Sequence, residues 1–186
     1  MGGYGVIIVL YFEIFSNVNA KFIYQIIFLC NNRVMSRKIV YVDMDGVLVD
    51  FKGFFTDFDK NKINKFGAPA LVPGVFSKMM PIKGALSAYK WLSIHFDVYI
   101  LSTAPWGNPS AWLDKRLWVE KYLADLARKK LILSHRKDLL IGDYLIDDRL
   151  AHGSQNFQGK FIHFGSDKFA NWASVINYLK EKENIK

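Results

Sequence analysis

Residues 39–50 read IVYVDMDGVLVD. The stretch opens with Ile39–Val42, a short apolar run of mostly β-branched residues that is typical of a strand buried on both faces. Asp43 and Asp45 follow this run directly, and a glycine then interrupts the extended pattern. An EF-hand loop also begins with D-x-D, but it needs a glutamate at its twelfth position, where this chain has Phe54. The stretch therefore predicts a buried strand that ends in two carboxylates.

The rest of the chain alternates short apolar runs with helical patterns. Strands that alternate with helices predict an α/β fold with a parallel sheet, in which ligands bind at the carboxyl ends of the strands. Residues 50–80 combine many phenylalanines and lysines with glycine and proline, and they predict a small helical insertion after the first strand. We expect further strands at Val98–Leu101, Leu131–Leu133, Tyr144–Ile146 and Lys160–Phe164, and helices at Gly84–His95, Ala111–Arg128 and Phe169–Leu179, the last two capped by Ser110 and Asp167.

The composition is that of a folded globular protein. The chain has 186 residues, of which 51% are hydrophobic and 23% charged, which suits one domain with a small insertion and excludes a disordered chain. The net charge of +8 favours anionic partners, but it does not distinguish nucleic acid, membrane surfaces and phosphorylated metabolites. Cys30 is the one cysteine, so an intramolecular disulfide is excluded and a reducing, cytoplasmic compartment is expected.

Residues 1–34 differ in composition from the remainder. They hold two apolar runs, Val6–Phe12 and Phe22–Cys30, and neither reaches the roughly 18–20 residues that a membrane-spanning helix needs. No basic segment precedes the first run, so the segment is a poor match to a secretory signal. We therefore expect residues 1–34 to be an extension outside the domain, or a consequence of start-site choice, with the functional domain at residues 35–186. A membrane anchor is the alternative.

Three further groups of polar residues follow predicted strands. Ser102 and Thr103 end a strand in YILSTAPW, where a hydroxyl and turning backbone amides can cradle a phosphate. The basic run HRK at residues 135–137 follows the next strand and could neutralise a phosphate oxygen. Asp147 and Asp148 follow an apolar triplet, where two adjacent acids are costly unless a cation lies between them, and Mg²⁺ prefers such oxygen ligands. Each group is weak evidence alone, but their common position at strand ends indicates phosphoryl chemistry.

The chemistry of phosphate monoesters explains why these residue types would occur together. An anionic nucleophile must approach an anionic phosphate, and a metal ion and a lysine can cancel the repulsion. A carboxylate can then attack and form an aspartyl-phosphate. A second acid must protonate the leaving oxygen and afterwards activate water.

The elements DMDGV, STAP, Lys137 and the DD pair resemble, in type and order, the four motifs of the haloacid dehalogenase (HAD) superfamily. The resemblance implies a Rossmann-like parallel sheet flanked by helices, with a small helical cap at residues 50–80. It implies that Asp43 is the nucleophile and Asp45 the general acid/base, since an acid at the second position resembles the phosphatase branch. Mg²⁺ would be held by Asp43, the backbone carbonyl of Asp45 and the pair Asp147–Asp148.

The resemblance also implies which residues bind the phosphate group, and it leaves two alternatives open. Arg136 could replace Lys137 as the phosphate-binding cation. The stretch IGDYLID resembles a G-D-x-x-x-D form of the fourth motif, which would pair Asp143 with Asp147, although the apolar triplet favours the adjacent pair that ends in Asp148. The implied phosphate-binding residues are Thr103, Ser102, Ala104 and Lys137.

The likeness is closer to one branch of the superfamily. DMDGVLVDF, PIKGA, LSTAPW, WVEKYL and HRKDLLIGDYLIDDR, from about Lys38 to the last helix, are similar to the 5′(3′)-deoxyribonucleotidases. This resemblance implies a magnesium-dependent phosphomonoesterase that acts on deoxyribonucleoside monophosphates, preferably those of pyrimidines. Its partner would be a small nucleotide; no stable nucleic-acid or membrane partner is expected, and a homodimer is left open.

Aromatic residues of the insertion are candidates for contact with a base. We expect Phe51, Phe76 and Trp106 to face the ligand, because aromatic rings stack on bases. The other cap phenylalanines are expected to form the core of the cap itself. The histidines at 95, 152 and 163 are expected to be structural or surface residues.

Other functions compete with this interpretation. The same chemistry could serve another small phosphate, such as a phosphosugar. A basic, aromatic-rich domain could instead bind nucleic acid on an inactive phosphatase fold. A phosphorylatable receiver also uses acids, a hydroxyl and a lysine at strand ends, but it presents its acid pair before the acceptor aspartate, and here that order is reversed.

Overall fold

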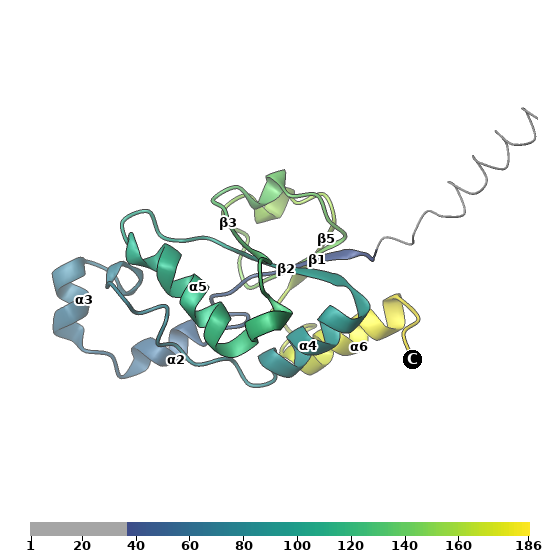
Figure 1. The fold of residues 1–186 in the computed structure, drawn as a ribbon, viewed down its shortest axis with the longest axis horizontal. Coiled ribbons are helices and arrows are strands. Elements are labelled where there is room, and N and C mark those ends of the chain that lie inside the picture. The colour runs from purple at the N-terminus through teal and green to yellow at the C-terminus, as the bar shows by residue number, and fades with distance from the viewer. Residues whose placement is uncertain (1–36) are drawn as a thin grey trace, which may run out of the picture. The chain divides into compact units, whose positions relative to one another are not determined.

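The computed structural model describes residues 37–186, so the extension predicted at residues 1–34 lies outside the described residues. A five-stranded sheet forms the centre, with the strand order β3-β2-β1-β4-β5 and parallel pairing throughout (Figure 1). This confirms the predicted parallel α/β fold. The strands are β1 (Ile39–Val42), β2 (Asp97–Ser102), β3 (Leu131–Leu133), β4 (Tyr144–Asp147) and β5 (Lys160–His163).

Helices of two kinds accompany the strands. Three longer helices pack on the sheet, two short ones lie in the insertion after β1, and single 3₁₀ turns complete the loops (Figure 1). The α-helices are α2 (Phe51–Thr56), α3 (Lys60–Phe66), α4 (Ala85–His95), α5 (Ser110–Leu123) and α6 (Trp172–Lys182); the 3₁₀ turns are η1 (Pro69–Leu71), η2 (Ala124–Leu126), η3 (Lys137–Leu139) and η4 (Ser154–Asn156).

Two predicted helix boundaries are wrong. Ser110 is the first residue of α5 rather than its N-cap, and its hydroxyl lies 3.0 Å from Oδ2 of Asp114 within the helix. The helix ends at Leu123, not at Arg128, because Ala124 has a φ of 42°, which the α-helix does not allow.

The N-cap of α6 also differs from the prediction. The cap is Asn171, not Asp167: the Asn171 side chain accepts from the backbone N–H of Ser174, and the Ser174 hydroxyl lies 3.3 Å from the Asn171 backbone nitrogen. This reciprocal arrangement is a capping box, and it fixes the start of the helix at Trp172.

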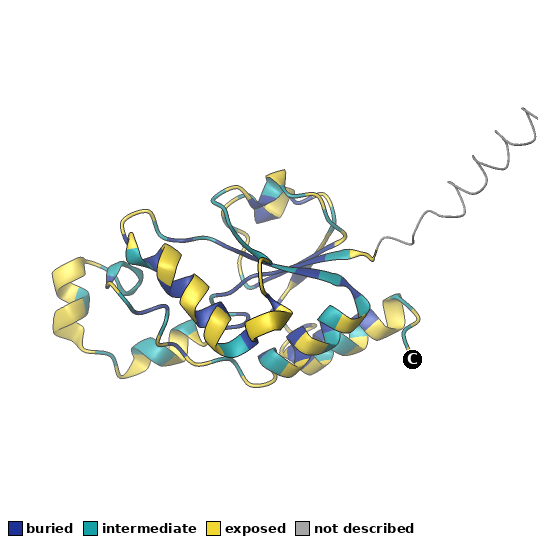
Figure 2. Ribbon diagram, viewed as in Figure 1, coloured by how far each residue is buried: buried dark blue, intermediate teal, exposed yellow. Residues whose placement is uncertain are grey.

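The two faces of the sheet are covered differently. Because side chains alternate along a strand, Val40 and Val42 face the larger core together with apolar residues of α4, α5 and α6, and α4 and α6 lie side by side there (Figures 1 and 2). Tyr41 faces the other way and packs with Leu145 and Phe157, beside the loops that contain η3 and η4. The strands are therefore buried on both faces, as their apolar sequences predict.

The register of the sheet brings the predicted polar residues to one edge. Val42 pairs with Ile100 of β2 on one side and with Ile146 of β4 on the other, so the carboxyl ends of these three strands lie at the same edge of the sheet. The chain adds β2 and β3 on one side of β1 and β4 and β5 on the other. The point where the order reverses is where parallel α/β sheets bind ligands, and Asp43 lies there.

The insertion at residues 50–80 is helical, as predicted, and much of its surface is exposed (Figure 2). The rings of Phe54, Phe55 and Phe58 pack on one another with centroids 5.1–5.4 Å apart. The insertion returns to the core along α5, where the Asn108 amide donates to the carbonyl oxygens of Ala70 and Val72. None of the helices in the described part of the chain has both the length and the apolar character needed to cross a bilayer.

Candidate active site

A tight loop after β1 sets the positions of Asp43 and Asp45. The backbone N–H groups of Leu48 and Val49 both donate to the carbonyl oxygen of Met44, at 2.9 and 2.8 Å. Gly46 adopts a φ of +80°, and a Cβ at this position would lie 2.4 Å from Oδ2 of Asp148. Glycine is therefore needed both for the turn and for the close approach of a carboxylate from β4.

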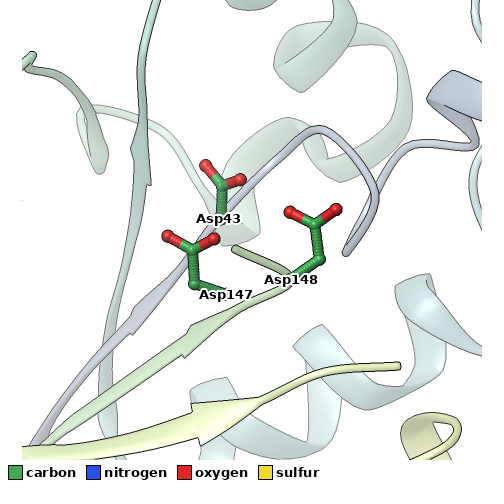
Figure 3. Close-up of side chains that lie close together, drawn as sticks. All are labelled: Asp43, Asp147 and Asp148. Carbon is green, nitrogen blue, oxygen red and sulfur yellow. The ribbon is translucent and has the colours of Figure 1, made fainter. Parts of the chain in front are cut away.

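Three carboxylates converge beside this loop. One oxygen from each of Asp43, Asp147 and Asp148 lies within 4.8 Å of the others (Figure 3). Oδ1 of Asp148 is buried and accepts no hydrogen bond from the described residues, and Arg149 Nε lies 3.5 Å from it. Burial raises the pKa of Asp147 to about 6 and also raises that of Asp148, and the charge of Asp43 adds to both shifts. Converging, incompletely satisfied carboxylates fit a divalent cation that prefers oxygen ligands.

Lys137 lies between two of these acids. Its Nζ is 2.9 Å from Oδ1 of Asp43 and 2.6 Å from Oδ2 of Asp147, and its side chain is buried. Burial alone would lower the pKa of Lys137, but the two carboxylates raise it above its usual value. Arg136, the alternative cation, is exposed and pairs with Asp138 instead.

Asp143, the alternative acid, is not near this cluster. Its Oδ2 accepts from the backbone N–H of Ile39 at 2.8 Å, where β1 begins. Asp43 follows the last residue of the same strand, so Asp143 lies at the opposite edge of the sheet. The structure therefore brings Asp148, rather than Asp143, to Asp43 and Asp147.

Asp45 belongs to a second ion pair that the sequence did not reveal. Its Oδ2 lies 2.6 Å from Nζ of Lys115, which also donates to the Ser102 hydroxyl at 3.0 Å. Burial raises the pKa of Asp45 even though Lys115 opposes the shift. Lys115 falls on the buried stripe of α5, four residues after Ala111 and three before Trp118, and that spacing is the signal that could have identified it.

Two cavities meet at Asp45 and Thr103. A small polar pocket is lined by Asp43, Lys137 and Asp147 among others. Beside it lies a cavity of about 420 Å³, within the range of small-molecule sites, whose lining is mainly apolar. The three aromatic residues predicted to face a ligand line this larger cavity: Phe51, Phe76 and Trp106.

Comparisons with known proteins agree with this arrangement. Residues 55–176 match the family model described as 5′ nucleotidase, deoxy (pyrimidine), cytosolic type C protein. A protein of Vibrio phage KVP40 that is assigned as a 5′(3′)-deoxyribonucleotidase is 53% identical over 144 residues, covering 77% of this chain and 85% of the phage protein. A protein of Bordetella pertussis with the same assignment is 33% identical over 137 residues, covering 60% of this chain and 74% of its own length.

The chain belongs to the cytosolic type C deoxy-5′-nucleotidase family. It is a hydrolase of phosphoric monoesters of the 5′-nucleotidase type. Solved structures support the fold of this nucleotidase: YfnB of Bacillus subtilis, assigned as a HAD-hydrolase and solved with magnesium, aligns with a TM-score of 0.55 at 11% identity over 77% of this chain and 99% of that one. A haloacid dehalogenase-like hydrolase of Streptococcus pneumoniae aligns with a TM-score of 0.51 at 12% identity, covering 77% and 91%. The HAD fold is thus confirmed.

The predicted phosphate-binding residues of the nucleotidase occupy different environments. Thr103 lines both cavities, and its hydroxyl donates to the carbonyl oxygen of Ser134 at 2.8 Å. Ser102 lines the small pocket, but it is fully buried and its hydroxyl accepts from Lys115. Ala104 is fully buried and is not among the described residues that line the two cavities.

His152 of the nucleotidase is exposed, as expected for a surface histidine, yet it lines both cavities. Its ring centroid lies 6.1 Å from that of His135, which lines the larger cavity. Partial desolvation of the imidazole lowers the pKa of His152, and the charges of Lys137 and Arg149 lower it further. His152 has a φ of 53°, and no sequence signal marks it as a cavity residue.

Proposed function

We propose that this nucleotidase is a magnesium-dependent phosphomonoesterase that dephosphorylates deoxyribonucleoside monophosphates through an aspartyl-phosphate at Asp43. The observation that carries the proposal is the position of Asp43. It lies against Lys137 and two further carboxylates, directly beside an aromatic-lined cavity of about 420 Å³. A phosphate in the polar pocket would then hold its nucleoside in the larger cavity.

The first half-reaction uses two aspartates in different roles. A carboxylate oxygen of Asp43 attacks phosphorus, the new O–P bond forms, and the ester P–O bond breaks. Asp45 donates a proton to the leaving ester oxygen. Because burial raises the pKa of Asp45, its protonated form is more abundant than that of an ordinary aspartic acid at the same pH. Lys137 offsets negative charge on the phosphate.

The second half-reaction restores the enzyme. Asp45, now ionised, takes a proton from a water molecule as the water oxygen attacks phosphorus, and the bond to Asp43 breaks to release phosphate. We assign the metal site to Asp43, the backbone carbonyl of Asp45, and Asp147 and Asp148. Mg²⁺ bound there would supply charge neutralisation for the phosphoryl group.

The larger cavity supports a nucleoside as the leaving group. The rings of Phe51 and Phe76 lie 6.1 Å apart by their centroids, and Trp106, 83% exposed, stands where the cavity meets solvent. Stacking on an aromatic ring is worth about 1–3 kcal/mol per base. The preference for pyrimidine deoxynucleotides follows the description of the family. We place the domain at residues 35–186, with residues 50–80 as its cap, and the reaction in the cytoplasm.

The test is phosphate release from a panel of phosphomonoesters in the presence of Mg²⁺, with the full chain beside Asp43→Asn and Asp167→Asn. Asp167 is an exposed carboxylate away from both cavities, which makes it a matched control. We expect activity concentrated on deoxynucleoside monophosphates, abolished in Asp43→Asn and unchanged in Asp167→Asn, because loss of a nucleophile removes turnover rather than raising KM.

Other outcomes would redirect the proposal. Activity on sugar phosphates alone would be compatible with Asp43 as the nucleophile but would exclude nucleotides as the substrate class. Equal activity in Asp43→Asn would exclude an aspartyl-phosphate at Asp43. Salt-sensitive binding of nucleic acid without hydrolysis would favour the binding-module alternative.

A further inference from the structure

We propose that Lys115 is a positioning residue that fixes the orientation of the Asp45 carboxyl group, which lines both cavities. The inference rests on the proposed function for the role of Asp45 in proton transfer. It adds a residue from α5 to a site that otherwise draws on the ends of strands.

The contacts of Lys115 engage one side of Asp45 only. Nζ of Lys115 lies 2.6 Å from Oδ2 of Asp45. Oδ1 of the same carboxyl group is buried and has no hydrogen-bond partner within residues 37–186. Within the described residues, the ion pair with Lys115 is therefore the side-chain contact that holds the Asp45 carboxyl group in one orientation.

The ammonium group of Lys115 is itself held on three sides. Besides Asp45 it donates to the Ser102 hydroxyl at 3.0 Å, and it lies 4.5 Å from the ring centroid of Phe76. Lysine carries three N–H donors, and the ring face attracts the cation. Lys115 and Ser102 are fully buried and Phe76 is 1% exposed, so this arrangement has little freedom to reorganise.

Lys115 acts through Asp45 rather than on the phosphate. Lys137 is one of the residues that line the polar pocket, whereas Lys115 is absent from the described lining of both the pocket and the larger cavity. Lys115 therefore lies behind Asp45 as seen from the ligand. The proton moves from Asp45 to the leaving oxygen in the first half-reaction and from water to Asp45 in the second, while the contact with Lys115 holds the carboxyl group in place.

The leaving group distinguishes this role from a structural one. A deoxynucleoside leaves as an alkoxide that needs a proton, whereas p-nitrophenolate leaves as a stable anion. The experiment measures the single-turnover rate of enzyme phosphorylation by deoxythymidine 5′-monophosphate and by p-nitrophenyl phosphate, with Mg²⁺ and the full chain. Lys115→Met is compared with Lys121→Met, an exposed lysine on the same helix.

We expect Lys115→Met to slow phosphorylation by the nucleotide about 100-fold and that by p-nitrophenyl phosphate less than about threefold, since a misplaced proton donor matters only where the leaving group needs a proton. Lys121→Met should match the unaltered protein with both substrates. Equal slowing of both substrates by Lys115→Met, with the unaltered protein active, would overturn the inference and leave the proposed function standing. An unaltered protein inactive on both substrates would overturn the proposed function and the inference with it.

A second comparison covers the case in which Lys115→Met folds poorly because Asp45 is left buried without its cation. Asp45→Asn removes that charge, so Lys115→Met is also introduced into the Asp45→Asn background. A positioning role predicts that the second change lowers the nucleotide rate by no more than about twofold there, because neighbouring residues that act as a unit are not additive. A further loss of about tenfold would show that Lys115 acts independently of Asp45 and would overturn the inference.

Discussion

The two buried lysines of the site, Lys137 and Lys115, occupy centres with different charge balance. Around Lys137, one buried ammonium group faces Asp43 and Asp147 directly, and Asp148 lies in the same cluster. Around Lys115, one ammonium group faces one carboxylate, that of Asp45. The first centre has an excess of negative charge that a divalent cation would offset, and the second is balanced.

This difference assigns separate tasks to the two centres. The centre with excess negative charge suits a divalent cation, which together with Lys137 would offset the charge of the carboxylates and of a phosphate. The balanced centre suits proton transfer, because its lysine keeps Asp45 oriented without adding charge to the phosphate pocket. A substitution at one centre should therefore leave the task of the other unchanged, whether that task is metal binding or proton transfer.

The largest effect is expected from Lys137→Met. Loss of this cation leaves Asp43 facing Asp147 at close range and removes a charge that stabilises the transferring phosphoryl group. We expect kcat/KM for deoxynucleoside monophosphates to fall by about 10³-fold or more. Arg136→Met is the control, since Arg136 is exposed and paired with Asp138; its activity should stay within about twofold of the unaltered protein. A larger loss in Arg136→Met would restore Arg136 as the phosphate-binding cation.

A pH-dependent effect of Mg²⁺ on stability should distinguish the centres next. The pKa of Asp147, about 6 in the folded metal-free protein, lies above the usual aspartate value, so the folded state takes up protons that the unfolded chain does not. This contribution favours the metal-free fold at low pH and is lost as pH rises through about 6. Mg²⁺ requires the ionised carboxylates, so its stabilisation should be largest above pH 6 and vanish toward pH 5.

Thermal unfolding in Mg²⁺ or EDTA at pH 5 and 7.5 measures this effect. At pH 7.5, Mg²⁺ at about 100 times its Kd should add about 2.7 kcal/mol to the free energy of unfolding. Asp148→Asn should lose most of this gain, whereas Asp45→Asn should keep it, because Asp45 is expected to contribute only its backbone carbonyl. If Asp45→Asn abolished the stabilisation by Mg²⁺, the Asp45 side chain would belong to the metal site, and the two centres would not be separate.

The two centres also differ in how far they can be predicted from the sequence, and the Lys137 centre is the more predictable one. Asp43, Asp147 and Asp148 come directly after apolar runs, and in a parallel sheet the ends of neighbouring strands meet at one edge. The position along the chain therefore fixes the position in space, and the cluster follows from the topology. Lys137 is placed similarly, a few residues past the end of β3.

Lys115 could not be placed by the same reasoning. The spacing from Ala111 and Trp118 places position 115 on the buried side of α5, but a charged residue in the middle of a helix is usually solvated, and the spacing does not show which group it contacts.

The misplaced boundaries have different causes. The positive φ of Ala124 is a backbone conformation that its residue type does not indicate. The cap at Asn171 is set by its reciprocal contact with Ser174, a local feature that a short sequence window does contain.

Ser102→Ala tests to which centre this hydroxyl belongs. The sequence assigns Ser102 to the phosphate, but its described hydroxyl contact is with Lys115. If Lys115 is its partner, the change should cost about 0.5–1.5 kcal/mol of stability, the value of one hydrogen bond, and leave inhibition by inorganic phosphate unchanged. Thr103→Val should weaken that inhibition. Weaker inhibition by inorganic phosphate in Ser102→Ala would instead assign the Ser102 hydroxyl to the Lys137 centre.

The smallest effect is expected at the neighbour of Lys115 in sequence. Arg116 lies about 100° around α5 from Lys115. Its side chain is 59% exposed and pairs with Glu120 one turn along the helix. Exposed pairs of this kind contribute about 0.3–0.5 kcal/mol, because water screens the charges and ordering two long side chains costs entropy. Arg116→Ala should therefore change the free energy of unfolding by no more than about 0.5 kcal/mol in urea titrations and leave kcat/KM unaltered. A much larger loss would mean that charge on α5 matters irrespective of burial. If Arg116→Ala left kcat/KM unaltered while Lys115→Met lowered activity strongly, the direction in which each cation projects from α5 would decide which of them takes part in the chemistry.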